Sequence, residues 1–205
     1  MNNERDTRTT ALPEGRQARA YHHGDLRNGL LEAARSILEE ESLAALTLRA
    51  VARKAGVSHA APYRHFPNHE ALLVELSIEG FDELREQIGE AAKASGTESD
   101  KIATIGAAYM RFIAARPALA RLMFGGQLPN RDQFPALGLK ADAIGEEIGQ
   151  ALHNQALGLA VWAAMHGLAM LVLENVIDLG QRRSGLAVLP ARSEIILRSL
   201  FATRE

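Results

Sequence analysis

Positive charges and hydrogen-bond donors are concentrated in residues 47–69 of this 205-residue sequence. The segment contains Arg49, Arg53, Lys54 and Arg64 but no Asp or Glu, although the whole chain has a formal net charge of -2. Guanidinium, hydroxyl and imidazole groups donate to phosphate oxygens and contact the polar atoms on base edges. The segment therefore predicts binding to double-stranded DNA through a short, locally basic stretch of chain.

Two short helices and a tight turn are expected to carry these side chains. Thr47 is a candidate N-cap for a helix whose apolar residues recur with the spacing of one buried face. Gly56 is expected to end that helix, because glycine takes the left-handed conformation without steric cost. Ser58 is expected to cap a second helix that runs to about His65 and contains Pro62 near its start. This pattern predicts a helix-turn-helix, whose second helix enters the major groove.

The whole chain predicts an all-α protein in three parts. Residues 1–20 have the composition of a flexible arm, residues 21–67 form the predicted helix-turn-helix domain, and residues 68–205 form a larger helical domain. A first helix is expected from about Asp25, and a long helix capped by Asn68 is expected to end near residues 94–96.

The boundaries of the later helices follow from caps and prolines. Ser99 or Asp100 is expected to cap the next helix, and Pro117 is expected to open a short helix that ends before Gly125. A further helix is expected over residues 139–153, and the last helix is expected to begin with Pro190 in its first turn.

Residues 156–173 are apolar almost throughout, with His166 as the one strongly polar residue. Their length alone makes them a marginal membrane span, but the histidine, two glycines and the absence of a companion span argue against one. We expect instead a helix buried inside protein, with small residues that allow a close helix neighbour. Together with the apolar last helix, it predicts a four-helix interface between two copies of the chain.

The composition excludes several classes of protein. The chain is 47% hydrophobic and 23% charged, as in globular proteins, and it has no cysteine, which excludes disulfides and thiolate chemistry. His22 and His23 are adjacent and lack the geometry of a metal site. No glycine-rich phosphate loop or nucleophile beside a base is recognisable. We therefore expect no enzyme activity, no cofactor, no metal and no membrane partner, and a cytoplasmic location.

Two motifs resemble a known family. The pattern T-x-R-x-V-A-x-x-A-G-V-S-x-x-x-x-Y-R-H-F-x-x-x-E-x-L-L, over residues 47–73, is similar to the DNA-binding domain of TetR-family transcriptional repressors. The segment AVWAAMHGLAMLVLE, over residues 160–174, resembles the Trp-His-Gly motif of one C-terminal branch of that family, with Trp162, His166 and Gly167 at the motif positions. The resemblance implies a helical homodimer that binds a palindromic operator and is released by a small-molecule effector.

The resemblance also implies roles for individual residues. Thr47 and Arg49 match phosphate contacts, Tyr63 and His65 match contacts to the DNA backbone, and Phe66 matches a core aromatic. Residues 58–61 match the groove-facing start of the recognition helix, where small side chains allow close approach to bases. The candidate DNA-binding residues are Thr47, Arg49, Ser58, His59, Ala60, Ala61, Tyr63, His65 and His69.

Two residues depart from the family pattern. His69 stands where the family usually has lysine, so this phosphate contact is expected to depend on pH or to be weaker. Pro62 lies inside the predicted recognition helix and removes one amide hydrogen bond.

Trp162 and His166 lie four residues apart and therefore share one helical face. One interpretation is a core tryptophan with a satisfied buried histidine. The other is a cavity wall with polar groups for a largely apolar ligand. The candidate ligand-binding residues are Tyr109, Phe112, Met123, Phe124, Trp162, Met165 and His166. A DNA-binding protein without a ligand remains an alternative, as does a helical carrier or enzyme.

Overall fold

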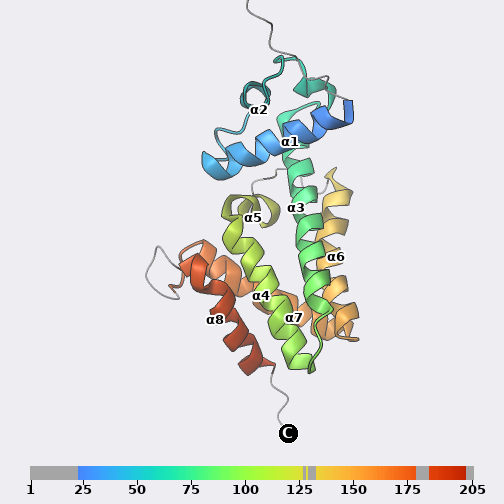
Figure 1. The fold of residues 1–205 in the computed structure, drawn as a ribbon, viewed down its shortest axis with the longest axis vertical. Coiled ribbons are helices and arrows are strands. Elements are labelled where there is room, and N and C mark those ends of the chain that lie inside the picture. Colours follow the sequence, from blue (N-terminus) through green and yellow to red (C-terminus); the bar gives the residue numbers. More distant parts are fainter. Residues whose placement is uncertain (1–22, 127, 129–132, 179–184, 202–205) are drawn as a thin grey trace, which may run out of the picture.

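The computed structural model describes residues 23–126, 128, 133–178 and 185–201, so the predicted arm lies outside the described residues. Over these residues the protein is all-α, as predicted, with eight α-helices, one 3-10 helix and no strand. At one end of the elongated molecule lie α1 (His23–Glu40), α2 (Leu48–Lys54) and the 3-10 helix η1 (Pro62–Arg64). The long helix α3 (His69–Ala92) runs from this end into the larger bundle (Figure 1).

The small N-terminal unit has its own apolar core. Leu30, Leu46 and Val51 are fully buried, and Phe66 is 1% exposed, as expected for a core aromatic. The guanidinium carbon of Arg27 lies 5.8 Å from the centre of the Phe66 ring, and Arg27 also forms an ion pair with Glu75 of α3. This contact joins α1, the segment after η1 and the first half of α3 into one body.

Five further helices build the bundle around α3. The most extensive packing joins α4 to α8, α6 to α7 and α3 to α6. A Cβ added to Gly158 would lie 2.4 Å from the Cα of Gly149, so these glycines permit the close approach of α6 and α7. The helices are α4 (Glu98–Ala115), α5 (Pro117–Phe124), α6 (Pro135–Ala151), α7 (Gln155–Leu173) and α8 (Gly185–Leu200).

Three predicted helix starts are wrong. The N-cap of α4 is Thr97, because its hydroxyl accepts from the amide of Asp100 while the Asp100 carboxylate accepts from the amide of Thr97, at 3.2 and 3.0 Å. Helix α6 begins at Pro135, whose fixed φ suits a first helical position. Helix α8 begins five residues before Pro190, which lies inside it at the cost of one backbone hydrogen bond.

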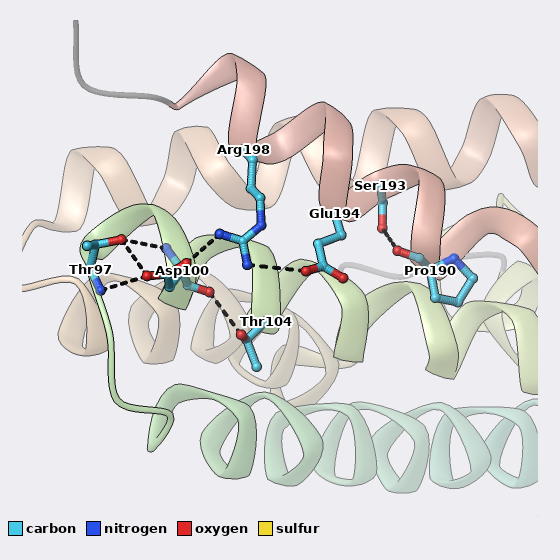
Figure 2. A network of polar contacts seen from close by, with 7 residues as sticks. All are labelled: Thr97, Asp100, Thr104, Pro190, Ser193, Glu194 and Arg198. Carbon is cyan, nitrogen blue, oxygen red and sulfur yellow. Dashed lines mark hydrogen bonds and ion pairs between the residues drawn. The ribbon is translucent and has the colours of Figure 1, made fainter.

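A surface network fixes α8 against the N-terminal end of α4 (Figure 2). Arg198 reaches from α8 to Asp100 and also donates to Glu194 at 3.2 Å. The hydrogen bond from Arg198, followed by those from Thr97, lowers the pKa of Asp100 to about 2. Because these groups are exposed, salt screens their attraction, so the network positions α8 more than it stabilises the fold.

Helix α7 is less buried than its sequence predicts. It is long and apolar enough to cross a membrane by composition alone, yet only 33% of its most apolar stretch is buried in the chain. Its inner face contacts α6, α4 and α8, while Leu159 and Leu171 are 59% and 41% exposed. The prediction of a helix buried on all sides is therefore wrong for the single chain, because no described helix covers the face that carries these leucines.

Candidate nucleic-acid interface and aromatic cluster

Helix α2 begins and ends as the sequence predicts. The Thr47 hydroxyl accepts from the amide of Ala50 at 3.1 Å, which satisfies one of the free amides of the first turn. At the other end Gly56 has a φ of +70°, and the amide of Val57 donates to the carbonyl of Ala52 at 3.0 Å. These two ends fix the direction in which the chain enters and leaves the turn.

The predicted recognition helix is not an α-helix. Residues 58–61 form turns, and only Pro62–Arg64 is helical, with the tighter 3-10 pattern. Pro62 has no amide hydrogen for the carbonyl of Ser58, and its ring would clash with that carbonyl in an α-helix. The Ser58 carbonyl instead accepts from the amide of Ala61 at 2.9 Å, and the Pro62 carbonyl accepts from His65 at 2.9 Å. The effect of Pro62 on this helix is therefore larger than the sequence predicts.

The predicted DNA-binding residues form two groups on this end of the molecule. Thr47, Arg49, Tyr63 and His69 line one hollow of about 550 Å³, although they come from α2, η1 and α3. The other predicted residues do not line this hollow. Ser58, His59 and Ala60 are exposed on the turn, whereas Ala61 and His65 are half-buried.

The hollow has further lining residues that sequence analysis did not assign to the site. Asn68 caps α3 by accepting from the amide of Ala71 at 2.8 Å, and this cap fixes where His69 begins the helix. Leu48 and Pro67 complete the lining. The cap was recognisable in the sequence, but its closeness to Thr47 depends on how α2 and α3 pack.

The basic side chains near the hollow differ in their partners. Arg49, Arg53 and Arg64 are exposed and form no ion pair within the described part of the chain. Lys54 donates to Glu40 of α1 at 2.7 Å, and this hydrogen bond is the main reason why the pKa of Glu40 is lowered. The three arginines are therefore available for an anionic partner, whereas the charge of Lys54 is partly neutralised.

In the bundle, four predicted ligand-binding residues come together. The Tyr109 hydroxyl is hydrogen-bonded to Nδ1 of His166 at 2.9 Å, and the Phe124 ring centre lies 4.6 Å from that of His166. Nε1 of Trp162 is buried nearby and has no hydrogen bond of normal geometry. Burial raises the pKa of Tyr109, and the nearby Trp162 side chain opposes this rise. Burial lowers the pKa of His166. The cluster thus combines aromatic surface with a few polar atoms.

The other three predicted ligand-binding residues are core side chains. Phe112, Met123 and Met165 are 1%, 0% and 0% exposed. A Cβ added to Gly80 would lie 2.6 Å from the sulfur of Met123, so this methionine fills the contact between α3 and α5. Their role as ligand contacts stays a prediction, and their present role is packing.

Comparison with known proteins identifies the N-terminal unit. Residues 30–76 match the family model described as bacterial regulatory proteins, tetR family. The chain carries a TetR-family DNA-binding domain. The matched residues include α2, η1 and the first part of α3, and therefore all the residues of the hollow. The match and the similar folds below support a TetR-family regulator, whereas the Trp-His-Gly branch stays a prediction.

Solved structures share the fold of most of this chain. A protein with unknown function from Rhodococcus sp. RHA1 is 29% identical, with a TM-score of 0.64 over 88% of this chain and 98% of that one. FadR, a fatty acid degradation regulator from Bacillus halodurans, is 15% identical, with a TM-score of 0.68 over 89% and 100% of the two chains. FadR from Bacillus subtilis, in complex with stearoyl-CoA, is 16% identical, with a TM-score of 0.63 over 84% and 98%. The two FadR likenesses concern the fold alone.

Proposed function

We propose that this TetR-family chain is a homodimeric transcriptional repressor that binds a palindromic operator and is released by a small, largely apolar ligand. The observation that carries the proposal is the hollow where Thr47, Arg49, Tyr63 and His69 meet inside the matched domain. Hydroxyl, guanidinium and imidazole donors in one exposed hollow suit a DNA phosphate, which fixes the register of the protein on the duplex. The exposed turn over residues 58–61 then meets the base edges.

The outer faces of α7 and α8 support a homodimer. Apolar side chains exposed together on two neighbouring helices are typical of an interface between protein chains. A two-fold axis through such an interface would present two DNA-binding domains, which is why we expect a palindromic operator. The exposed side chains are Leu159, Leu171, Ile195, Ile196 and Leu200.

Helix α5 offers a route by which ligand binding in the bundle would reach the DNA-binding domain. Its last residue, Phe124, contacts His166 of the aromatic cluster. At its other end, Glu39 of α1 accepts from the amides of Leu119 and Ala118 at 3.0 and 3.3 Å. A ligand that displaces Phe124 would therefore move α5 and with it α1. Such a ligand empties the operator only if it prefers the displaced state by a few kcal/mol.

The ligand class follows from the lining of the cluster and from one structural neighbour. Phe81, Phe124 and Tyr109 form adjoining aromatic surfaces, with ring centres 5.2 and 6.4 Å apart. Such surfaces suit a ligand that is largely apolar, with Trp162 and His166 supplying polar contacts. The stearoyl-CoA bound to FadR from Bacillus subtilis makes long acyl compounds the first to test.

Selection from a random pool of DNA duplexes tests the proposal. We expect recovery of a palindromic sequence, bound by two chains, and loss of binding when a ligand is added. Trp162 is the only tryptophan, so its fluorescence reports ligand binding directly. The ligands to add are stearoyl-CoA and any compounds that mass spectrometry detects in the purified protein. A ligand-independent DNA-binding protein would instead show broad, salt-sensitive binding with little sequence preference, and a monomer at micromolar concentration would contradict the dimer.

A further inference from the structure

We infer that DNA binding by this chain is coupled to the uptake of a proton by His69, so that mild acid strengthens the complex. The inference rests on the proposed function, because it concerns the regulation of the same hollow. His69 is the first residue of α3 and is exposed at the wall of the hollow. Imidazole is the side chain whose charge changes between pH 5 and 8 when it is exposed to water.

The hollow beside His69 is lined by positive and neutral groups. Arg49 faces the hollow from α2, Tyr63 faces it from η1, and no carboxylate is among its described lining residues. The amides at the start of α3 add a partial positive charge at the same place. Both features favour an anion in the hollow.

The carboxylates closest along α3 do not lie in the hollow. Glu70 is half-buried and does not line the hollow, and Glu75 is occupied by Arg27 of α1. A DNA phosphate would therefore be the anion that faces His69. Its negative charge favours the protonated imidazole, which then donates from both ring nitrogens.

Thermodynamic linkage relates this proton uptake to the pH dependence of the affinity for DNA. If the complex binds more protons than the free protein, its affinity rises as the pH falls through the titration range of the imidazole. Arg49 keeps its charge throughout this range, so it contributes a constant attraction. His59 and His65 belong to the same domain but do not line the hollow, so their contributions are separable by substitution at His69.

Titration calorimetry measures the proton directly. Binding of a duplex recovered by selection is measured at pH 7 in buffers of different ionisation enthalpy, so that the dependence of the heat on the buffer gives the number of protons taken up. We compare wild type with His69→Gln, which cannot be charged, and His69→Lys, which is always charged. We expect greater proton uptake by wild type than by either variant, and tight binding by His69→Lys at every pH.

The matched control is His153→Asn. His153 is also exposed, but it lies in the turn between α6 and α7, at the other end of the molecule from α2 (Figure 1). Its φ of 52° is one that asparagine also adopts readily. We expect wild-type proton uptake for this variant. Unaltered thermal unfolding of all three variants shows that they are folded.

The size of the effect follows from an exposed ion pair. Between pH 8 and pH 6 we expect wild-type affinity to rise about twofold to fivefold more per bound chain than that of His69→Gln. Equal proton uptake by wild type and both His69 variants would overturn the inference while leaving DNA binding intact. Absence of saturable DNA binding by wild type at every pH would overturn both the proposed function and the inference drawn from it.

Discussion

The polar side chains at the two ends of the molecule differ in exposure and in whether they have a hydrogen-bond partner. Around the DNA-binding hollow, Arg49 and Tyr63 are exposed, and Arg49 has no ion pair within the described residues. In the bundle, Tyr109 is fully buried and hydrogen-bonded to His166. An exposed donor without a partner is ready for a large, charged partner such as DNA. A buried donor that already has a partner is exchanged only for a ligand that replaces that hydrogen bond.

Because of this difference, substitutions at the DNA-binding end and in the bundle should affect different quantities: DNA affinity and the free energy of unfolding. The exposed groups cost little to remove from the folded chain, since water replaces them, so their substitution should act on binding. The buried groups hold the bundle together, so their substitution should act on unfolding as well. Substitutions made in matched pairs, one at each end, test this separation.

The largest effect is expected from Arg49→Ala. Loss of a hydrogen bond between a charged donor and phosphate costs about 1.5–3 kcal/mol, which weakens DNA binding roughly 10- to 100-fold per chain. The salt dependence of binding should fall by about one unit per chain, because one phosphate contact is lost. Fluorescence anisotropy at several salt concentrations measures both quantities.

Arg111→Ala is the matched control for this change. Arg111 is exposed on α4 and has no ion pair within the described residues, but it lies in the bundle. Its removal should leave DNA binding unchanged. Equal losses from both substitutions would mean that net charge, rather than the hollow, determines affinity.

Packing between α6 and α7 gives the next largest effect. In Gly158→Ala the new methyl group would meet the backbone of Gly149, so we expect a loss of about 1–3 kcal/mol in the free energy of unfolding. Gly138→Ala, on α6, meets nothing within 4 Å and should stabilise the chain by about 0.5–1 kcal/mol. Urea unfolding of both variants measures the difference. Equal destabilisation by Gly138→Ala would contradict a specific role for the close contact between α6 and α7.

Features of the sequence that act over a few residues predicted the DNA-binding end well. Thr47 and Asn68 cap their helices as expected, and Gly56 takes the expected positive φ. Each of these depends on neighbours within three or four residues. The exception is residues 58–65, where Pro62 converts the predicted helix into turns and a 3-10 helix. Helix preference and the missing amide of proline compete there, and the missing amide has the larger effect.

Contacts between distant segments were harder to predict. The sequence indicated that Trp162 and His166 share a face, but the pairing of His166 with Tyr109 joins residues 57 positions apart. Phe112 and Met123 were grouped with them by residue type; both are packed in the core, and their contact with a ligand stays a prediction. Residue type predicts burial, whereas the choice between core and cluster depends on how α4, α5 and α7 cross.

Tyr109→Phe and Tyr63→Phe form the third test of the comparison. Removal of the Tyr109 hydroxyl leaves Nδ1 of His166 without its hydrogen bond, which should lower the free energy of unfolding by about 1–3 kcal/mol. Tyr63 is 51% exposed, so the loss of its hydroxyl should weaken binding to all DNA sequences and leave unfolding unchanged. Urea unfolding and anisotropy on both variants are the measurements. Loss of binding at a single base position in Tyr63→Phe would contradict its contact with the DNA backbone.

The smallest effect concerns the pH dependence of stability, which should come from the cluster. Burial lowers the pKa of His166, so the unfolded chain binds more protons than the folded chain below the ordinary histidine pKa of about 6.5. Stability is therefore complete above that pH and falls as the pH drops through it towards the lower pKa of the folded state. His166→Gln should flatten this part of the curve of unfolding free energy against pH, because glutamine takes up no proton in this range. If His166→Gln left the curve unchanged, the pH dependence of stability would come from outside the cluster, and the separation between the two ends would fail.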